Sequence, residues 1–154
     1  KVLSKRIKNI GKNLSISYDK PLHMLHVYGH DDNYTPPITS RFFAAATGAH
    51  IANNGELGGQ FDSFDGHDVV LADLPIEGNS DAGMTGVTVQ HKPDLKTCKS
   101  DVDCKASSTK CVSGQCLGYD GHFVAFRKER CLNQIGVFVK TMIDGETPVV
   151  PPGD

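Results

Sequence analysis

The stretch from Pro21 to Pro37, PLHMLHVYGHDDNYTPP, constrains the fold more than any other part of the chain. It begins with an apolar run, Leu22 to Tyr28, and a cluster of Gly, Asp, Asn and Pro residues ends that run abruptly. This pattern is typical of a buried parallel strand that delivers polar side chains to one edge of a sheet. Open α/β sheets bind ligands outside the carboxyl ends of their strands, so the acidic residues just past Gly29 lie where chemistry would be done.

Further strands and helices are expected along the chain. The segment 85–91, TGVTVQH, alternates apolar and polar residues and predicts a second strand. Helical spacing predicts a helix from Ile38 to Ala52 and a basic helix over residues 1–18. Residues 60–86 read as an irregular surface excursion with one short apolar run, 69–74, and the tail 147–154 reads as extended.

A last amphipathic helix is predicted from Arg127 to Ile143. Its apolar residues are spaced for one face: Cys131, Ile135, Phe138, Val139 and Met142. We expect this helix to cover the sheet.

Four of the five cysteines, Cys98, Cys104, Cys111 and Cys116, lie in one short polar segment that has almost nothing with which to build a core. The spacings lack the C-x-x-C pairs of a zinc site and no His lies among them, so two disulfides are expected and no metal. Three connectivities remain open. Disulfides imply an oxidising compartment, so the protein is expected to be secreted, periplasmic or on the cell surface. Cys131 is either a buried thiol or the partner of a cysteine outside this chain.

The net charge of −2 gives no sign of a nucleic-acid partner, and no apolar run approaches the length of a transmembrane segment. A chain of 154 residues is long enough for one domain with its own core. No cofactor is expected. The first residue is Lys, which suggests processing, proteolysis or a cut before this point.

Two motifs resemble the second half of an α/β-hydrolase of the secreted bacterial esterase and lipase type. The first is Gly29-His30-Asp31-Asp32-Asn33-Tyr34-Thr35-Pro36, which matches the family's Gly-x-x-Asp-x-x-Val/Thr-Pro loop. The second is Asp120-Gly121-His122-Phe123-Val124, which is followed by an amphipathic stretch as in the family's histidine loop and last helix. The resemblance implies that residues 1–96 and 118–154 form the C-terminal part of a hydrolase domain, with residues 97–117 as a disulfide-rich insert. The implied fold class is α/β, with a parallel sheet and flanking helices.

The resemblance places Asp32 as the acid and His122 as the base of a Ser-Asp-His triad, in the family's chain order. Alternatives remain open: Asp31 for the acid and His67, in Phe64-Asp65-Gly66-His67-Asp68, for the base. His30 is a weak candidate for contact with substrate. Asp101 and Asp103 could bind calcium but are more simply read as solvated side chains.

The nucleophile is missing from the sequence, which contains no Gly-x-Ser-x-Gly elbow. The nearest imitation, Gly78-Asn79-Ser80-Asp81-Ala82-Gly83, has the wrong spacing and follows the acid. Two parallel strands also cannot bury both faces of a sheet by themselves. We therefore expect the acid- and base-bearing part of a serine ester hydrolase, with the serine on an N-terminal part or companion chain. The alternative is an inactive binding or assembly module on a hydrolase-like scaffold.

Overall fold

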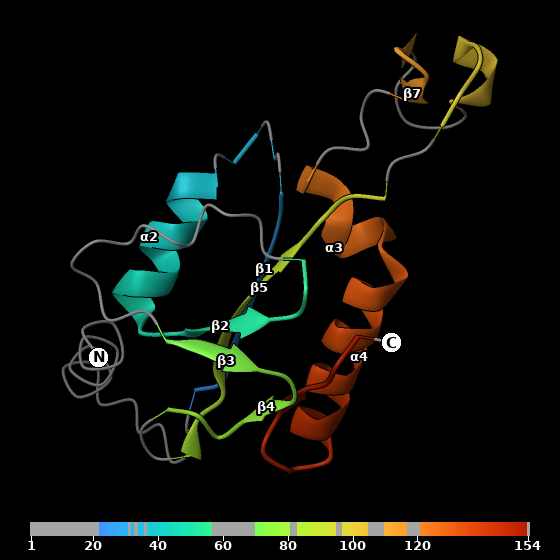
Figure 1. Ribbon diagram of the computed structural model, residues 1–154. Coiled ribbons are helices and arrows are strands. Elements are labelled where there is room, and N and C mark those ends of the chain that lie inside the picture. The colour runs from blue at the N-terminus through green and yellow to red at the C-terminus, as the bar shows by residue number, and fades with distance from the viewer. Residues whose placement is uncertain are drawn as a thin grey trace, which may run out of the picture.

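A four-stranded parallel sheet forms the centre of the computed structural model (Figure 1). The structure describes residues 22–30, 32, 34–35, 37–56, 70–80, 83–94, 97–104, 110–116 and 121–153. Across the sheet the strands are β1 (Met24–Gly29), β5 (Gly86–His91), β2 (His50–Asn53) and β3 (Leu71–Asp73), and every neighbouring pair is parallel. Strands β1 and β2 are therefore not neighbours in the sheet, because β5, which comes later in the sequence, lies between them.

Strands β1 and β5 run in register over six residue pairs, from Met24 opposite Gly86 to Gly29 opposite His91. Both strands therefore end at the same edge of the sheet. Every residue of β5 is buried, as expected for a central strand covered on both faces. The two strands predicted from the sequence are thus present and adjacent.

Helices cover both faces of the sheet. Helix α2 (Pro37–Thr47) lies on one side, and α3 (Val124–Arg127) and α4 (Glu129–Ile143) lie on the other (Figure 1). On the α4 side, Val87 and Val89 of β5 pack with Phe138 in the main hydrophobic core. The α/β class with flanking helices is confirmed.

The helix predicted from Ile38 to Ala52 is too long. Helix α2 ends at Thr47, and Gly48 follows it with a φ of 69°, in the left-handed region that favours glycine at helix ends. The Ala49 N–H donates to the Ala44 carbonyl and closes the last turn. Residues 50–53 then form β2, in which Ile51 and Ala52 are buried. The prediction is too long because a single glycine can be tolerated inside a helix, so it does not take Gly48 as the end of the Ala-rich run.

The described part of the region expected to be an irregular excursion contains two short strands. Residues 71–73 form β3, which pairs with β2, and Ile76–Glu77 form β4. The tail contributes β8 (Val149–Val150), which pairs antiparallel with β4 and buries Val150 completely. Strands of two or three residues show no measurable alternation, so the sequence pattern could not reveal them.

The last helix is present, but its buried face differs from the predicted one. Cys131 and Phe138 are buried as expected, together with the polar Gln134. Val139 and Met142 are exposed instead, at 39% and 45%. The amide of Gln134 can face inward because its Nε2 donates to the Pro151 carbonyl at 2.8 Å.

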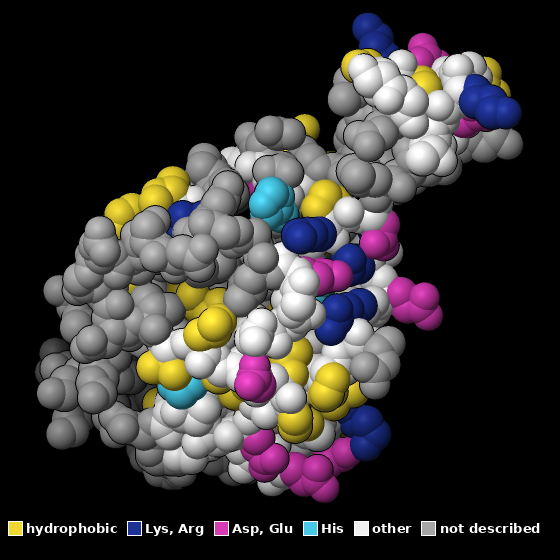
Figure 2. Space-filling view, viewed as in Figure 1, with side chains coloured by type: hydrophobic (Ala, Val, Ile, Leu, Met, Phe, Trp, Pro, Cys, Tyr) yellow, Lys and Arg dark blue, Asp and Glu magenta, His cyan; other side chains and the backbone are white. Residues whose placement is uncertain are grey.

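The predicted pair of disulfides is present. Cys98 bonds Cys111 and Cys104 bonds Cys116, which settles the connectivity left open by the sequence. The disulfide module, residues 97–104 and 110–116, also contains the hairpin of β6 (Cys111–Val112) and β7 (Gln115–Cys116). Figures 1 and 2 show this module as a lobe set apart from the sheet and its helices. Cys131 is a buried free thiol, and burial raises its pKa to about 11.

The basic helix expected over residues 1–18 lies outside the described residues. Among the helices that the structure describes, none has the length and apolar character needed to cross a membrane.

Candidate active site

Asp32 and His122, which are far apart in the sequence, lie next to each other at the carboxyl edge of the sheet. The Oδ1 atom of Asp32 is 3.4 Å from Nδ1 of His122. This distance is longer than a well-formed N–H···O hydrogen bond, but it is within the range of an ion pair. The structure therefore brings together the two residues that the sequence motifs singled out.

The Asp32 carboxylate is held in place by its own loop. Its Oδ1 accepts hydrogen bonds from the backbone N–H groups of Tyr34 and Thr35, at 2.8 and 2.9 Å. This is an Asx turn, and it fixes the side chain shortly after β1 ends. Only 7% of the side chain is exposed, so the carboxylate is removed from bulk water.

His122 lies on a short 3-10 helix, Gly121–Phe123, which leads directly into α3. Its side chain is 39% exposed, so an incoming group can reach part of the ring. The ring of Tyr34 stands 4.6 Å from the imidazole, and that of Phe123 stands 5.1 Å from it. The Arg127 guanidinium lies over Phe123, 4.5 Å from the ring centre. The imidazole thus sits between an almost buried carboxylate and an aromatic surface.

Two glycines, Gly29 and Gly121, allow the segment that carries Asp32 to meet the segment that carries His122. A β-carbon on Gly29 would lie 2.0 Å from the carbonyl oxygen of Gly121, and one on Gly121 would lie 2.1 Å from that of His30. Both contacts involve backbone, which cannot move aside as a flexible side chain would. The end of β1 and the histidine loop therefore approach each other more closely than any larger residue would allow.

The other sequence candidates are placed as follows. The His30 backbone lies beside the site, and its N–H donates to the His91 carbonyl at 2.8 Å. Asp31 and His67 lie outside the described residues. Ser80 lies beside Gly86, at the amino end of β5, where a β-carbon on Gly86 would be 3.1 Å from its Oγ. A six-residue strand spans roughly 16 Å between that end and the edge that carries His122.

The carboxylates considered for calcium are engaged within the disulfide module. Asp103 accepts hydrogen bonds from the backbone N–H groups of Lys99 and Ser100, and Asp101 accepts one from that of Cys111. These bonds give Asp101 and Asp103 a structural role, which is to hold the backbone of the disulfide module. Within the described ranges, the only cluster of metal-ligand side chains is Cys98, Cys104 and Cys116, and these cysteines form the disulfides.

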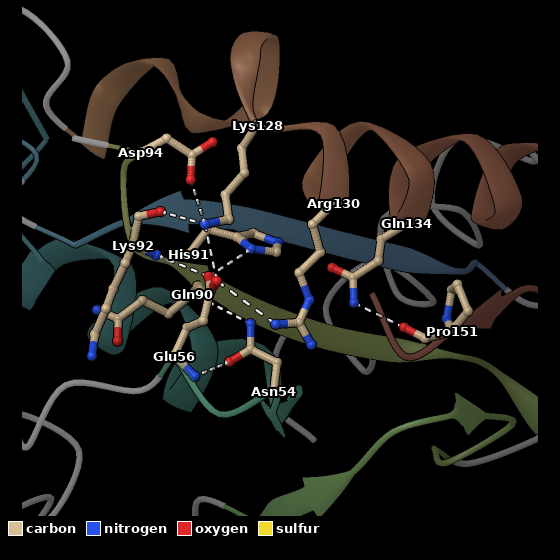
Figure 3. Close-up of polar contacts among 10 residues, drawn as sticks. All are labelled: Asn54, Glu56, Gln90, His91, Lys92, Asp94, Lys128, Arg130, Gln134 and Pro151. Carbon is tan, nitrogen blue, oxygen red and sulfur yellow. Dashed lines mark hydrogen bonds and ion pairs between the residues drawn. The ribbon is translucent and has the colours of Figure 1, made fainter. Parts of the chain in front are cut away.

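A charge cluster near the site was not predicted from the sequence. This charge cluster consists of six residues that meet at the carboxyl edge of the sheet (Figure 3): Glu56, His91, Lys92, Asp94, Lys128 and Arg130. Burial alone would raise the pKa of Glu56, but its bonds to Lys128 and to the Lys92 N–H outweigh burial and lower that pKa. Burial also lowers the pKa of His91, although Glu56 opposes this effect. They come from three segments that are far apart in the sequence, residues 56, 91–94 and 128–130, so no spacing signal connects them.

No protein-family model matches this chain, and neither does any curated protein or solved structure. The site must therefore be interpreted from its own geometry.

Proposed function

We propose that this chain is the acid- and base-bearing part of a serine ester hydrolase, with Asp32 as the acid and His122 as the base. The contact between Asp32 Oδ1 and His122 Nδ1 carries the proposal. A carboxylate at Nδ1 selects the tautomer in which that nitrogen carries the proton, so Nε2 becomes the base. The same carboxylate stabilises the imidazolium that forms when Nε2 takes a proton from serine.

The position of the pair also supports this function. The Asp32 loop follows β1, and the segment that carries His122 packs against the end of the same strand through Gly121, at the edge where α/β sheets bind ligands. The contact of 3.4 Å is loose, and such contacts often tighten once the nucleophile and substrate are in place. The partly exposed imidazole beside an almost buried carboxylate supports proton transfer between His122 and a group that approaches from the surface.

The nucleophile comes, in this proposal, from a separate part of the protein that carries Gly-x-Ser-x-Gly. The present sequence lacks that motif, and Ser80 is at the opposite edge of the sheet from His122. Strand β1 has a described partner on one side only, so its other edge could accept a further parallel strand. The substrate would be a carboxylic ester, and the expected location is outside the cytoplasm.

Labelling with a fluorophosphonate probe tests the proposal. In the native protein, with all of its companion chains, we expect one serine to be labelled and p-nitrophenyl butyrate to be hydrolysed. His122→Ala should abolish both signals while circular dichroism stays unchanged. His50→Gln serves as the matched control because His50 is the first residue of β2. It lies at the amino ends of the strands, opposite the carboxyl ends where His122 lies.

Two results would contradict the proposal. Undiminished labelling in His122→Ala would remove the base role from this residue and leave His67 as the next candidate. The absence of any labelled serine or companion would support the alternative, a binding or assembly module without catalytic activity.

A further inference from the structure

The carboxylate of Glu56 is the centre of the charge cluster and contacts four donors. Its Oε1 lies 2.9 Å from Nζ of Lys128 and 3.7 Å from Nη1 of Arg130. Its Oε2 lies 3.1 Å from Nδ1 of His91 and accepts the Lys92 backbone N–H at 3.0 Å. Figure 3 shows these groups converging on one carboxylate. Because His91 is fully buried and Glu56 is 17% exposed, solvent screens these contacts only weakly.

The backbone around Glu56 is itself fixed to the sheet. Asn54 follows β2, and its Oδ1 accepts the Glu56 N–H at 3.0 Å. The Nδ2 of Asn54 donates to the carbonyl of Gln90 in β5, at 2.6 Å. Asn54 therefore holds Glu56 at the carboxyl ends of two neighbouring strands, β2 and β5. The Glu56 carboxylate is fixed relative to this edge of the sheet.

Lys128 occupies the junction between α3 and α4. Its backbone N–H donates to the Val124 carbonyl, and its own carbonyl accepts the Leu132 N–H. Its ammonium group contacts the Lys92 carbonyl at 2.8 Å, Glu56 at 2.9 Å and Asp94 at 3.1 Å. Three acceptors match the three protons of an ammonium group, and only 11% of the side chain is exposed. Side chain and backbone of this residue thus fix the helix junction to the sheet.

The helix junction is only six residues from His122. The intervening residues form the end of the 3-10 helix and the single turn of α3, so little slack separates the two positions. At its other end, the segment is fixed by the close approach of Gly121 to Gly29. A shift of the junction would therefore move the imidazole relative to Asp32, whose loop belongs to β1.

We propose that the Glu56–Lys128 ion pair is a positioning device that holds His122 in contact with Asp32. This inference rests on the base role proposed for His122. Buried ion pairs add little net stability compared with apolar residues, so the role proposed for this pair is to impose one geometry on the groups that it joins. The pair acts through the helix junction and does not touch the reacting atoms.

The double variant Glu56→Gln/Lys128→Met removes both charges, so neither partner is left buried without the other. It should be made in the complete protein, meaning this chain together with the part that carries the serine. We expect kcat for p-nitrophenyl butyrate to fall at least tenfold, while KM stays within twofold of the wild type. The matched control is Lys140→Met/Asp144→Asn, which removes an exposed ion pair from the same helix. This control should keep the wild-type kcat.

A second measurement does not depend on turnover. The rings of Tyr34 and His122 are 4.6 Å apart, which should give nuclear Overhauser effects between their protons in the wild type. These effects should weaken or disappear in the double variant and persist in the control. If the wild type hydrolyses no ester, the proposed function fails, but this comparison still decides whether the ion pair positions His122.

Glu56→Asp is a milder variant, which retains the charge but shortens the side chain by one methylene. We expect it to lower kcat about threefold or more with KM unchanged, and it decides the question if the double variant does not fold. A double variant that is folded, with wild-type kcat and an intact Tyr34–His122 contact, would overturn the proposal. Where only Glu56→Asp folds, the same wild-type behaviour in that variant would overturn it.

Discussion

Gly29 and Gly121 face each other at the edge of the sheet with no room for a β-carbon on either residue. A β-carbon on Gly29 would lie 2.0 Å from the Gly121 carbonyl oxygen, far inside van der Waals contact. Gly29 ends β1, and Gly121 begins the 3-10 helix that carries His122. Each motif identified in the sequence thus contains a glycine whose role is to let the other motif approach.

Gly121→Ala should separate the two loops and reduce activity. A misplacement of about 1 Å in catalytic groups can lower the rate about 100-fold, and overpacking costs about 1–3 kcal/mol of stability. Ester hydrolysis and thermal unfolding measure the two effects. The control is Gly136→Ala in α4, where a β-carbon meets nothing within 4 Å. That change should stabilise the helix by about 0.5–1 kcal/mol and leave activity unaltered. Full activity in Gly121→Ala would show that the close approach is not required.

Asp32→Asn should separate the structural role of this residue from its electrostatic role. The carboxamide oxygen can still accept the N–H groups of Tyr34 and Thr35, so the turn should survive. The negative charge opposite His122 is lost, and the comparable change in serine proteases lowers kcat about 10⁴-fold. Kinetics and thermal unfolding together test this expectation. Asp32→Ala, which also loses the turn, should unfold more easily than Asp32→Asn by about 1 kcal/mol. Equal activity in Asp32→Asn and the wild type would exclude Asp32 as the acid.

The charge cluster predicts that acid destabilises the fold. The folded-state pKa of His91 lies below its ordinary value of 6.5, so the unfolded chain binds a proton first as the pH falls below 6.5. The pKa of Glu56 is also lowered, and its contribution is present above 4.5 and lost as the pH falls through the folded-state value. Both effects have the same sign. Thermal midpoints measured from pH 7 to pH 4 should therefore decrease.

The variant Glu56→Gln should have a lower midpoint at pH 7, because Lys128 loses one of its two carboxylate partners. Its midpoint should also decrease more steeply between pH 7 and pH 5, because the pKa of His91 falls further once Glu56 no longer opposes the effect of burial. The exposed residue Glu77 provides the control, since Glu77→Gln should keep the wild-type pH dependence. An unchanged slope in Glu56→Gln would show that this carboxylate does not contribute to acid unfolding.

Loss of the Cys98–Cys111 disulfide should destabilise the module but not the sheet. The two disulfides of the module close loops of 13 and 12 residues, and each is expected to contribute about 3 kcal/mol to a segment that has little core of its own. In Cys98→Ser/Cys111→Ser, hydrogen exchange should accelerate over residues 97–104 and 110–116. Exchange in β5 and α4 should stay slow. Faster exchange in β5 would show instead that the module supports the sheet.

Asp32 and His122 could be singled out from the sequence because each lies in a recognisable local pattern. Asp32 follows an apolar strand and a glycine, and His122 lies between a glycine and an amphipathic helix. Their meeting depends on the position of β1 in the sheet and on the close approach of Gly121 to Gly29. Strands β1 and β5 are both six residues long, which is enough for their hydrophobic pattern to be visible.

The short strands and the charge cluster could not be predicted, because no local sequence pattern determines them. Strands β3, β4 and β8 are too short to show a period, and they are stabilised by pairing with distant segments. The charge cluster joins Glu56 to Lys128, 72 positions later, through contacts that no local spacing records. Gly48 did carry a usable signal, because a glycine after an Ala-rich helix favours a C-terminal cap over continuation.

The place of β5 at the centre of the sheet has a consequence for biosynthesis. When the ribosome has delivered β1 and β2, these strands have no common neighbour, because the strand that joins them is made some thirty residues later. Until it emerges, their hydrogen-bonding edges remain open to other nascent chains, so this portion depends on rapid completion or on a chaperone to reach its native partners.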